Sequence, residues 1–131
     1  MVVGGTIFIV EDNPTMSDLI SWRSLEVGFI TVGSAWDYQS AMERLEAFSP
    51  DMLPEIILMD ITFPGEKDGI DTAIEITEKY NIPIVYISSS MDDSTLERAK
   101  LTKPFGFIIK PFSDEQLQAT LEMALQNKRR D

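Results

Sequence analysis

Short apolar runs alternate with longer stretches of helical spacing along this sequence. The apolar runs have the length of strands, and each ends at polar or turn-forming residues: 6–10, 29–33, 56–59, 84–87 and 107–109. The run at 56–59 has no polar residue, which indicates a strand buried on both faces. The run at 29–33 is mixed in polarity. We therefore expect five strands, with 29–33 at an edge of the sheet.

The segments between and after these runs predict five helices, at about 14–26, 37–48, 70–80, 92–102 and 113–127. Asn13 is a good N-cap and Pro14 a good first residue for the first helix. Gly28 is expected to end it. The buried side of this helix is expected to be formed by Leu19, Ile20 and Trp22.

The last two helices are expected to begin with capping boxes, formed by Ser94 with Glu97 and by Ser113 with Gln116. The helix at 92–102 has a thin apolar stripe, which predicts a weakly anchored element that is free to move. The buried stripes expected for the third and fifth helices are Ile70, Ala73, Ile74 and Thr77, and Leu117, Leu121, Ala124 and Leu125.

The alternation of strands and helices is typical of an α/β fold. It predicts one doubly wound, five-stranded parallel sheet with right-handed crossovers and a helix after each strand. The length of 131 residues fits one domain with a core of its own. We expect a single domain over residues 1–131.

Charge and composition exclude several classes of function. Twenty-two acidic against eleven basic residues give a net charge of −11, which makes direct nucleic-acid binding a poor hypothesis. No run is long enough to span a membrane, and the first residues lack the basic start of a signal peptide. We expect a cytoplasmic protein. The absence of Cys and His excludes zinc sites, thiol nucleophiles and imidazole bases.

Polar residues follow four of the predicted strands. Glu11 and Asp12 follow the first, Asp60 the third, Ser88 the fourth and Lys110 the fifth. In a parallel sheet, these strand ends lie along one edge, where such sheets bind their ligands. We therefore expect three carboxylates, a hydroxyl and an ammonium group to converge on one cleft.

Three clustered acids repel one another unless a cation neutralises them. Mg²⁺ is the hard cation that fits oxygen ligands of this kind. It would keep Asp60 ionised and able to attack, while Lys110 and Ser88 suit the oxygens of an incoming phosphoryl group. The chemistry predicted is phosphoryl transfer to a carboxylate, which gives an aspartyl phosphate.

Each of these residues also has an ordinary structural interpretation. Asp60 and Ser88 suit turns, and Glu11 and Asp12 suit the start of a helix. Lys110 suits the protection of an edge strand. Their coincidence at the same ends of four strands favours the functional interpretation.

Four segments carry a resemblance to a known family. They are IFIVEDNP at 7–14, IILMDITFPGEKDGI at 56–70, IPIVYISSS at 82–90 and FGFIIKPF at 105–112. With these motifs, the chain resembles the receiver domains of two-component response regulators over nearly its full length. The resemblance implies a flavodoxin-like fold with strand order 2-1-3-4-5.

The resemblance also implies roles for individual residues. Asp60 would be the phosphoacceptor, Glu11 and Asp12 would hold Mg²⁺ together with Asp60 and the backbone carbonyl of Thr62, and Ser88 and Lys110 would bind the phosphoryl group. The Lys110–Pro111 peptide would be cis.

Three further positions follow from the resemblance. Phe107 stands where the family keeps an aromatic switch residue, commonly Tyr, so a switch here would rest on packing alone. Thr62 and Ser90 stand where the family tunes hydrolysis of the acyl phosphate. Because neither is an acid or an amide, we expect a long-lived phosphorylated state. The loop after Asp60 is longer than the family's commonest form, so its path is left open.

The sequence has no His, so the phosphoryl group must come from outside the chain. The expected donor is a sensor histidine kinase, a phosphotransfer protein or a small phosphodonor. Phosphorylation is expected to alter the face made by 92–102, 107–109 and 113–127. The effect would pass to an output protein or through a homodimer. No turnover enzyme is expected beyond self-dephosphorylation.

Two alternative functions stay open. A phosphohydrolase of the haloacid dehalogenase type also phosphorylates an Asp at a strand end, but it would need a second Asp where this chain has Thr62. A degenerate receiver could instead act as an unphosphorylated interaction module.

Overall fold

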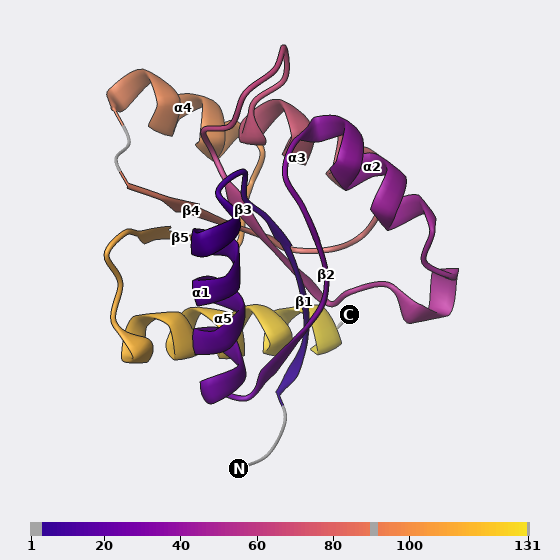
Figure 1. Cartoon of the computed structure of the whole chain (residues 1–131), viewed down its shortest axis with the longest axis vertical. Coiled ribbons are helices and arrows are strands. Elements are labelled where there is room, and N and C mark those ends of the chain that lie inside the picture. The colour runs from indigo at the N-terminus through magenta and orange to yellow at the C-terminus, as the bar shows by residue number, and fades with distance from the viewer. Residues whose placement is uncertain (1–3, 90–91, 131) are drawn as a thin grey trace.

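The computed structural model describes residues 4–89 and 92–130 as a five-stranded parallel sheet between two layers of helices (Figure 1). The strand order is β2-β1-β3-β4-β5, as expected. The strands are β1 (Gly5–Val10), β2 (Phe29–Ala35), β3 (Ile56–Asp60), β4 (Ile84–Ser88) and β5 (Gly106–Ile109). The helices are α1 (Pro14–Glu26), α2 (Tyr38–Glu46), α3 (Gly69–Lys79), α4 (Asp93–Leu101) and α5 (Asp114–Arg130), with a short 3₁₀ turn, η1 (Pro50–Met52).

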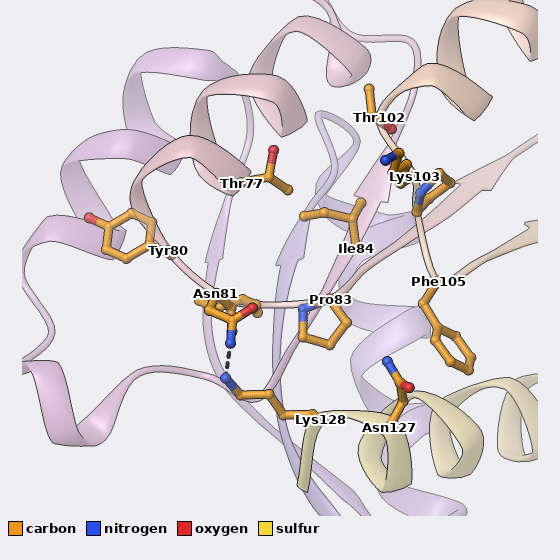
Figure 2. A pocket seen from close by; sticks show the side chains of 12 residues that line it. Thr77, Tyr80, Asn81, Pro83, Ile84, Thr102, Lys103, Phe105, Asn127 and Lys128 are labelled. Carbon is orange, nitrogen blue, oxygen red and sulfur yellow. Dashed lines mark hydrogen bonds between the residues drawn. The ribbon is translucent and has the colours of Figure 1, made fainter. Parts of the chain in front are cut away.

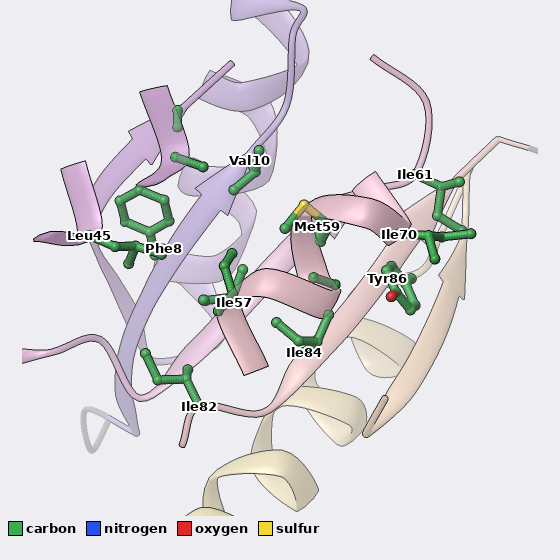
Figure 3. Close-up of a cluster of buried hydrophobic side chains, with 14 of the residues drawn as sticks. Phe8, Val10, Leu45, Ile57, Met59, Ile61, Ile70, Ile82, Ile84 and Tyr86 are labelled. Atoms are coloured by element: carbon green, nitrogen blue, oxygen red, sulfur yellow. The ribbon is translucent and has the colours of Figure 1, made fainter. Parts of the chain in front are cut away.

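Each face of the sheet has its own hydrophobic core. On one face, β1, β3 and β4 pack against α2, α3 and α4 through side chains such as Phe8, Ile57 and Tyr86 (Figure 3). On the other face, the alternate residues of the same strands pack against α1 and α5. All five residues of β3 are buried, because this strand lies in the middle of the sheet and is covered on both faces.

The parallel pairing brings the carboxyl ends of the strands to one edge. Val10 lies opposite Met59, Asp60 opposite Ile87, and Ser88 opposite Ile109. Residues at the ends of β1, β3, β4 and β5 or directly after them therefore lie near one another. They include the predicted site residues Glu11, Asp12, Asp60, Ser88 and Lys110.

Gly69 fixes the start of α3 against the end of β3. Its amide donates to the Ile61 carbonyl at 2.8 Å, and a Cβ at this position would lie 1.9 Å from the backbone oxygen of Asp60. Only glycine permits this close approach of two backbones. The helix therefore begins immediately beside the strand end that carries Asp60.

The loop between β3 and α3, whose path the sequence left open, projects from the molecule at the top of Figure 1. Gly65 in this loop has a left-handed backbone, with φ of 116°. Lys67 returns the chain to the helices: it forms an ion pair with Glu75 of α3 and lies 4.2 Å from the centre of the Tyr38 ring. One side of the loop is thereby fixed to α2 and α3.

Several helix predictions need correction. Leu19 and Trp22 of α1 are 38% and 64% exposed, and only Ile20 of the three expected residues is buried. The apolar residues of α1 occupy more than one face, so spacing alone did not identify the buried one. In α3 the buried stripe is Ile70, Ala73 and Ile76, whereas Ile74 and Thr77 are exposed.

The starts of the last two helices differ in outcome. The N-cap of α4 is Asp92, which accepts from the Thr95 amide at 2.7 Å; the predicted pairing of Ser94 with Glu97 is wrong, since Ser94 donates to Asp92 instead. The carboxylate two residues earlier is the stronger acceptor for the helix amides. At α5, the Ser113 hydroxyl accepts from the Gln116 amide, which is one of the two bonds of the predicted capping box.

Candidate functional site at the carboxyl edge of the sheet

Three carboxylates gather where β1 and β3 end. Glu11, Asp12 and Asp60 each offer an oxygen within 4.8 Å of the others. Glu11 and Asp60 are almost fully buried, whereas Asp12 is exposed. The Asn13 amide donates to Glu11 at 3.1 Å, and the Thr62 amide donates to Asp60 at 3.2 Å. The acids that the sequence placed at two strand ends therefore form one cluster.

The surroundings of the cluster disfavour the ionised form of Asp60 and Asp12, so the pKa of each is raised. Burial, followed by the nearby Glu11 carboxylate, raises the pKa of Asp60 to about 7. Burial and Glu11 also raise the pKa of Asp12. Three hard oxygen donors close together, two of them with a raised pKa, are a donor set that suits a small divalent cation such as Mg²⁺.

Lys110 reaches the same cluster from the end of β5. Its ammonium group lies 2.9 Å from Glu11 Oε1, with both side chains largely buried. The Lys110 amide donates to the Ser88 carbonyl at 2.7 Å, and the Lys110–Pro111 peptide is cis as expected. Ser88 is 2% exposed. The structure thus brings the ammonium group of Lys110 to the three acids, as predicted, and there it contacts Glu11.

The remaining predicted positions lie at the margin of the site. Thr62 is exposed, just beyond Asp60. Phe107 is half-buried and stacks on Tyr86, with ring centres 5.8 Å apart and planes 26° apart. Ser90 lies outside the described residues.

Two hollows have contrasting linings. Glu11 and Asp12 line one of about 300 Å³ together with Trp36. A second, of about 420 Å³, lies near the amino ends of β4 and β5, and Figure 2 shows Lys103, Asn127 and Lys128 around it. Among the described residues, no acidic side chain lines the second hollow. Of these two, the first is the one continuous with the acid cluster.

Sequence reasoning missed two polar contacts near the site. The Tyr86 hydroxyl lies 2.8 Å from Thr102 Oγ1, and Arg98 of α4 binds Asp68 and Asp71 at the start of α3. A tyrosine inside an otherwise apolar strand was the available signal for the first contact. The second joins residues 27 or more positions apart, which no local pattern reveals.

Comparisons with known proteins identify the family. Residues 7–122 match the response regulator receiver domain family. The chain is 33% identical over 119 residues to the transcriptional regulatory protein PdtaR of Mycobacterium tuberculosis, a match that covers 91% of this chain and 56% of the relative. The chain therefore spans about half the length of the curated relatives it matches.

Solved structures give the same result. The signal receiver domain of a modulated diguanylate cyclase from Desulfovibrio desulfuricans G20 is 32% identical, with a TM-score of 0.85 over 95% of this chain and 96% of that one. The receiver domain of NtrX from Brucella abortus is 29% identical, with a TM-score of 0.79 over 92% and 98%. The chain belongs to the response regulator receiver domain family of two-component signalling.

Proposed function

We propose that this receiver is a phosphorylation switch whose acceptor is Asp60. The observation that carries the proposal is the position of this carboxylate: it is buried at the end of β3, within 4.8 Å of two other acids. The positively charged ammonium group of Lys110 belongs to the same cluster, because it contacts Glu11. An attacking carboxylate, a cation site and a phosphate-binding ammonium group are the parts that phosphoryl transfer needs.

Mg²⁺ is the proposed cofactor. Glu11, Asp12 and Asp60 would hold it, with the Thr62 backbone carbonyl as a further ligand. The ion would supply positive charge that keeps Asp60 ionised and offsets the charge of an incoming phosphoryl group. Burial, followed by the Glu11 carboxylate, raises the pKa of both Asp60 and Asp12, and a bound cation would offset this by favouring the ionised carboxylates, which supports the assignment.

The proposed reaction needs few protein groups. A carboxylate oxygen of Asp60 bonds to the phosphorus of a donor phosphohistidine, the phosphorus–nitrogen bond breaks, and the released imidazole takes up a proton from solvent. Lys110 moves from Glu11 to pair with the transferred phosphoryl group, and the Ser88 hydroxyl donates to it. The product is an aspartyl phosphate.

The phosphohistidine must come from outside residues 1–131, because these residues contain no His. The proposed partners are a cytoplasmic sensor histidine kinase or phosphotransfer protein and an output protein that contacts α4, β5 and α5, or a second copy of the chain. Residues 1–131 would act as one receiver unit, without turnover beyond self-dephosphorylation.

Among the described residues, no helix has the length and apolar character of a membrane span.

Intact-mass measurement tests the proposal. The chain is incubated with Mg²⁺ and acetyl phosphate, and Asp60→Asn is compared with Asp51→Asn, a change at an exposed carboxylate in η1. We expect one phosphoryl adduct on the wild type and on Asp51→Asn, and no adduct on Asp60→Asn or when Mg²⁺ is chelated before acetyl phosphate is added. Phosphate release without an adduct would favour a hydrolase. No adduct and no phosphate release would favour an unphosphorylated interaction module.

A further inference from the structure

Helix α4 is attached to the body by few apolar contacts. Of its nine residues, only Ala99 is buried, and Leu101 at its end is 81% exposed. Thr95 and Leu96 are half-buried. A helix of this length gains most of its stability from packing, so polar contacts have an unusually large share in holding α4 in place.

Arg98 provides the main polar contact of α4 with α3. Its guanidinium group lies 3.0 and 3.4 Å from the two carboxylate oxygens of Asp68 and 3.2 Å from Asp71. Asp68 is the N-cap of α3, and Asp71 completes its capping box. The planar guanidinium thus binds both acids that start the neighbouring helix, a geometry that lysine cannot reproduce.

The start of α3 is in turn fixed to the proposed phosphoacceptor. Asp68 ends the loop that follows β3, and the next residue, Gly69, donates to the Ile61 carbonyl and lies against the Asp60 backbone. Arg98 is therefore connected to the Asp60 backbone through Asp68 and the neighbouring Gly69.

The carboxyl end of α4, one turn beyond Arg98, is connected to the aromatic residue at the switch position. The Thr102 hydroxyl donates to the Ala99 carbonyl at 2.6 Å, so the Tyr86 hydroxyl donates to Thr102. Tyr86 stacks on Phe107 of β5. Helix α4 therefore bridges the segment after Asp60 and the aromatic pair formed by Tyr86 and Phe107.

We propose that Arg98 is a positioning residue that holds α4 against the start of α3 and so couples the segment after Asp60 to the face formed by α4, β5 and α5. The part that concerns phosphorylation rests on the function proposed above. In the unphosphorylated protein, the contact of Arg98 with Asp68 and Asp71 keeps α4 in the observed place. A phosphoryl group on Asp60 shifts the segment at 61–69, weakens this contact and releases the helix.

An isolated exposed ion pair would have a small effect, equivalent to about a two- to five-fold change in an equilibrium. A change of this size is large for α4, because the free energy of its local opening depends on the few contacts that hold this helix. The contact also uses two carboxylates, and the Asp68 and Arg98 side chains are partly shielded from solvent.

Hydrogen exchange of the unphosphorylated protein tests the first half of the proposal. Arg98→Ala is compared with Lys100→Ala, which removes the same charge from the same helix at an exposed position. We expect amides of 95–101 to exchange about three-fold faster or more in Arg98→Ala and at the wild-type rate in Lys100→Ala. Arg98→Lys should lie between them. Equal exchange in the two alanine variants would overturn the proposal.

Asp71→Asn supplies a second, independent check. The asparagine oxygen can still accept from the Asp68 amide, so the capping box survives while the charge is lost. If Arg98 acts through Asp71, the effects of Arg98→Ala and Asp71→Asn on exchange of α4 should be less than additive. Fully additive effects would contradict a direct contact.

The rate of labelling by acetyl phosphate tests the second half. Because the Arg98 contact opposes the shifted conformation, Arg98→Ala should be phosphorylated about three-fold faster or more than the wild type, and Lys100→Ala at the wild-type rate. Faster exchange in α4 with an unchanged labelling rate would overturn the coupling. Failure of every variant to accept phosphate would instead overturn the proposed function and leave the exchange result to decide the role of Arg98.

Discussion

Lys110 and Glu11 form an ion pair across the carboxyl edge of the sheet, with 2.9 Å between Nζ and Oε1. The pair joins the end of β5 to the end of β1. It is largely buried, with the side chain of Glu11 3% and that of Lys110 16% exposed. The ammonium group is therefore the main local counter-charge to Glu11, Asp12 and Asp60.

Replacement of Lys110 should destabilise the metal-free protein more than loss of an exposed lysine. Removing one member of a buried pair leaves the other charge uncompensated, at a cost of about 3–5 kcal/mol in the free energy of unfolding. We expect this loss for Lys110→Ala in urea denaturation with a chelator, and partial recovery in Mg²⁺. Lys100→Ala is the control. Similar stabilities of the two variants without Mg²⁺ would contradict this account.

The raised pKa of Asp60 should make the free energy of unfolding of the metal-free protein depend on pH. In the folded state its pKa is raised from 3.8 to about 7, chiefly by burial. Between these values the folded protein binds the extra proton, so the free energy of unfolding should fall as pH rises from about 4 to about 7. Asp60→Asn removes this contribution and should be more stable than the wild type at pH 8, by about 1 kcal/mol or more.

The stability difference between Asp60→Asn and the wild type should shrink toward pH 4, where the wild-type carboxyl of the folded protein is protonated. Thermal or urea unfolding at several pH values, with a chelator present, measures it. Parallel stability curves for the two proteins would show that Asp60 titrates without a shift.

Gly69 should tolerate no side chain. The close approach of its backbone to Asp60 leaves no room for a Cβ, so Gly69→Ala must displace the start of α3 and lose about 3 kcal/mol or more of folding free energy. Gly106→Ala is a suitable control, because its Cβ would meet only the Thr120 methyl group at 3.4 Å. Equal denaturation midpoints for the two variants would contradict the close approach.

Because position 62 is a threonine rather than an acid or an amide, we predict a long-lived aspartyl phosphate. The exposed threonine cannot act as a general base or orient a water strongly. Once the phosphodonor is removed, without a phosphatase, we expect Thr62→Glu or Thr62→Asn to lose the label about ten-fold faster or more than the wild type. Thr62→Val, which keeps the backbone amide and the side-chain shape, should lose it at the wild-type rate. An unchanged lifetime in the acid and amide variants would refute the prediction.

The sequence predicted the sheet and the position of the acids because both depend on local pattern. The run Ile56–Asp60 contains a buried strand and its polar end in five adjacent residues, and parallel topology then places Asp60 beside Glu11. The exposed face of α1 was not predictable in the same way, since Leu19, Ile20 and Trp22 give no unique stripe. Contacts such as Arg98 with Asp68 depend on how α3 and α4 are placed, which no local pattern specifies.

The hollow beside Glu11 and Asp12 has a useful physical consequence. Trp36 lines it and is half exposed, with the Arg44 guanidinium 4.6 Å from the centre of its ring. Indole emission depends on nearby charge and solvent, so entry of a cation into the acid cluster should change the fluorescence of Trp36. Trp22 is the only other tryptophan, and Trp22→Phe would leave a single intrinsic optical reporter of the site.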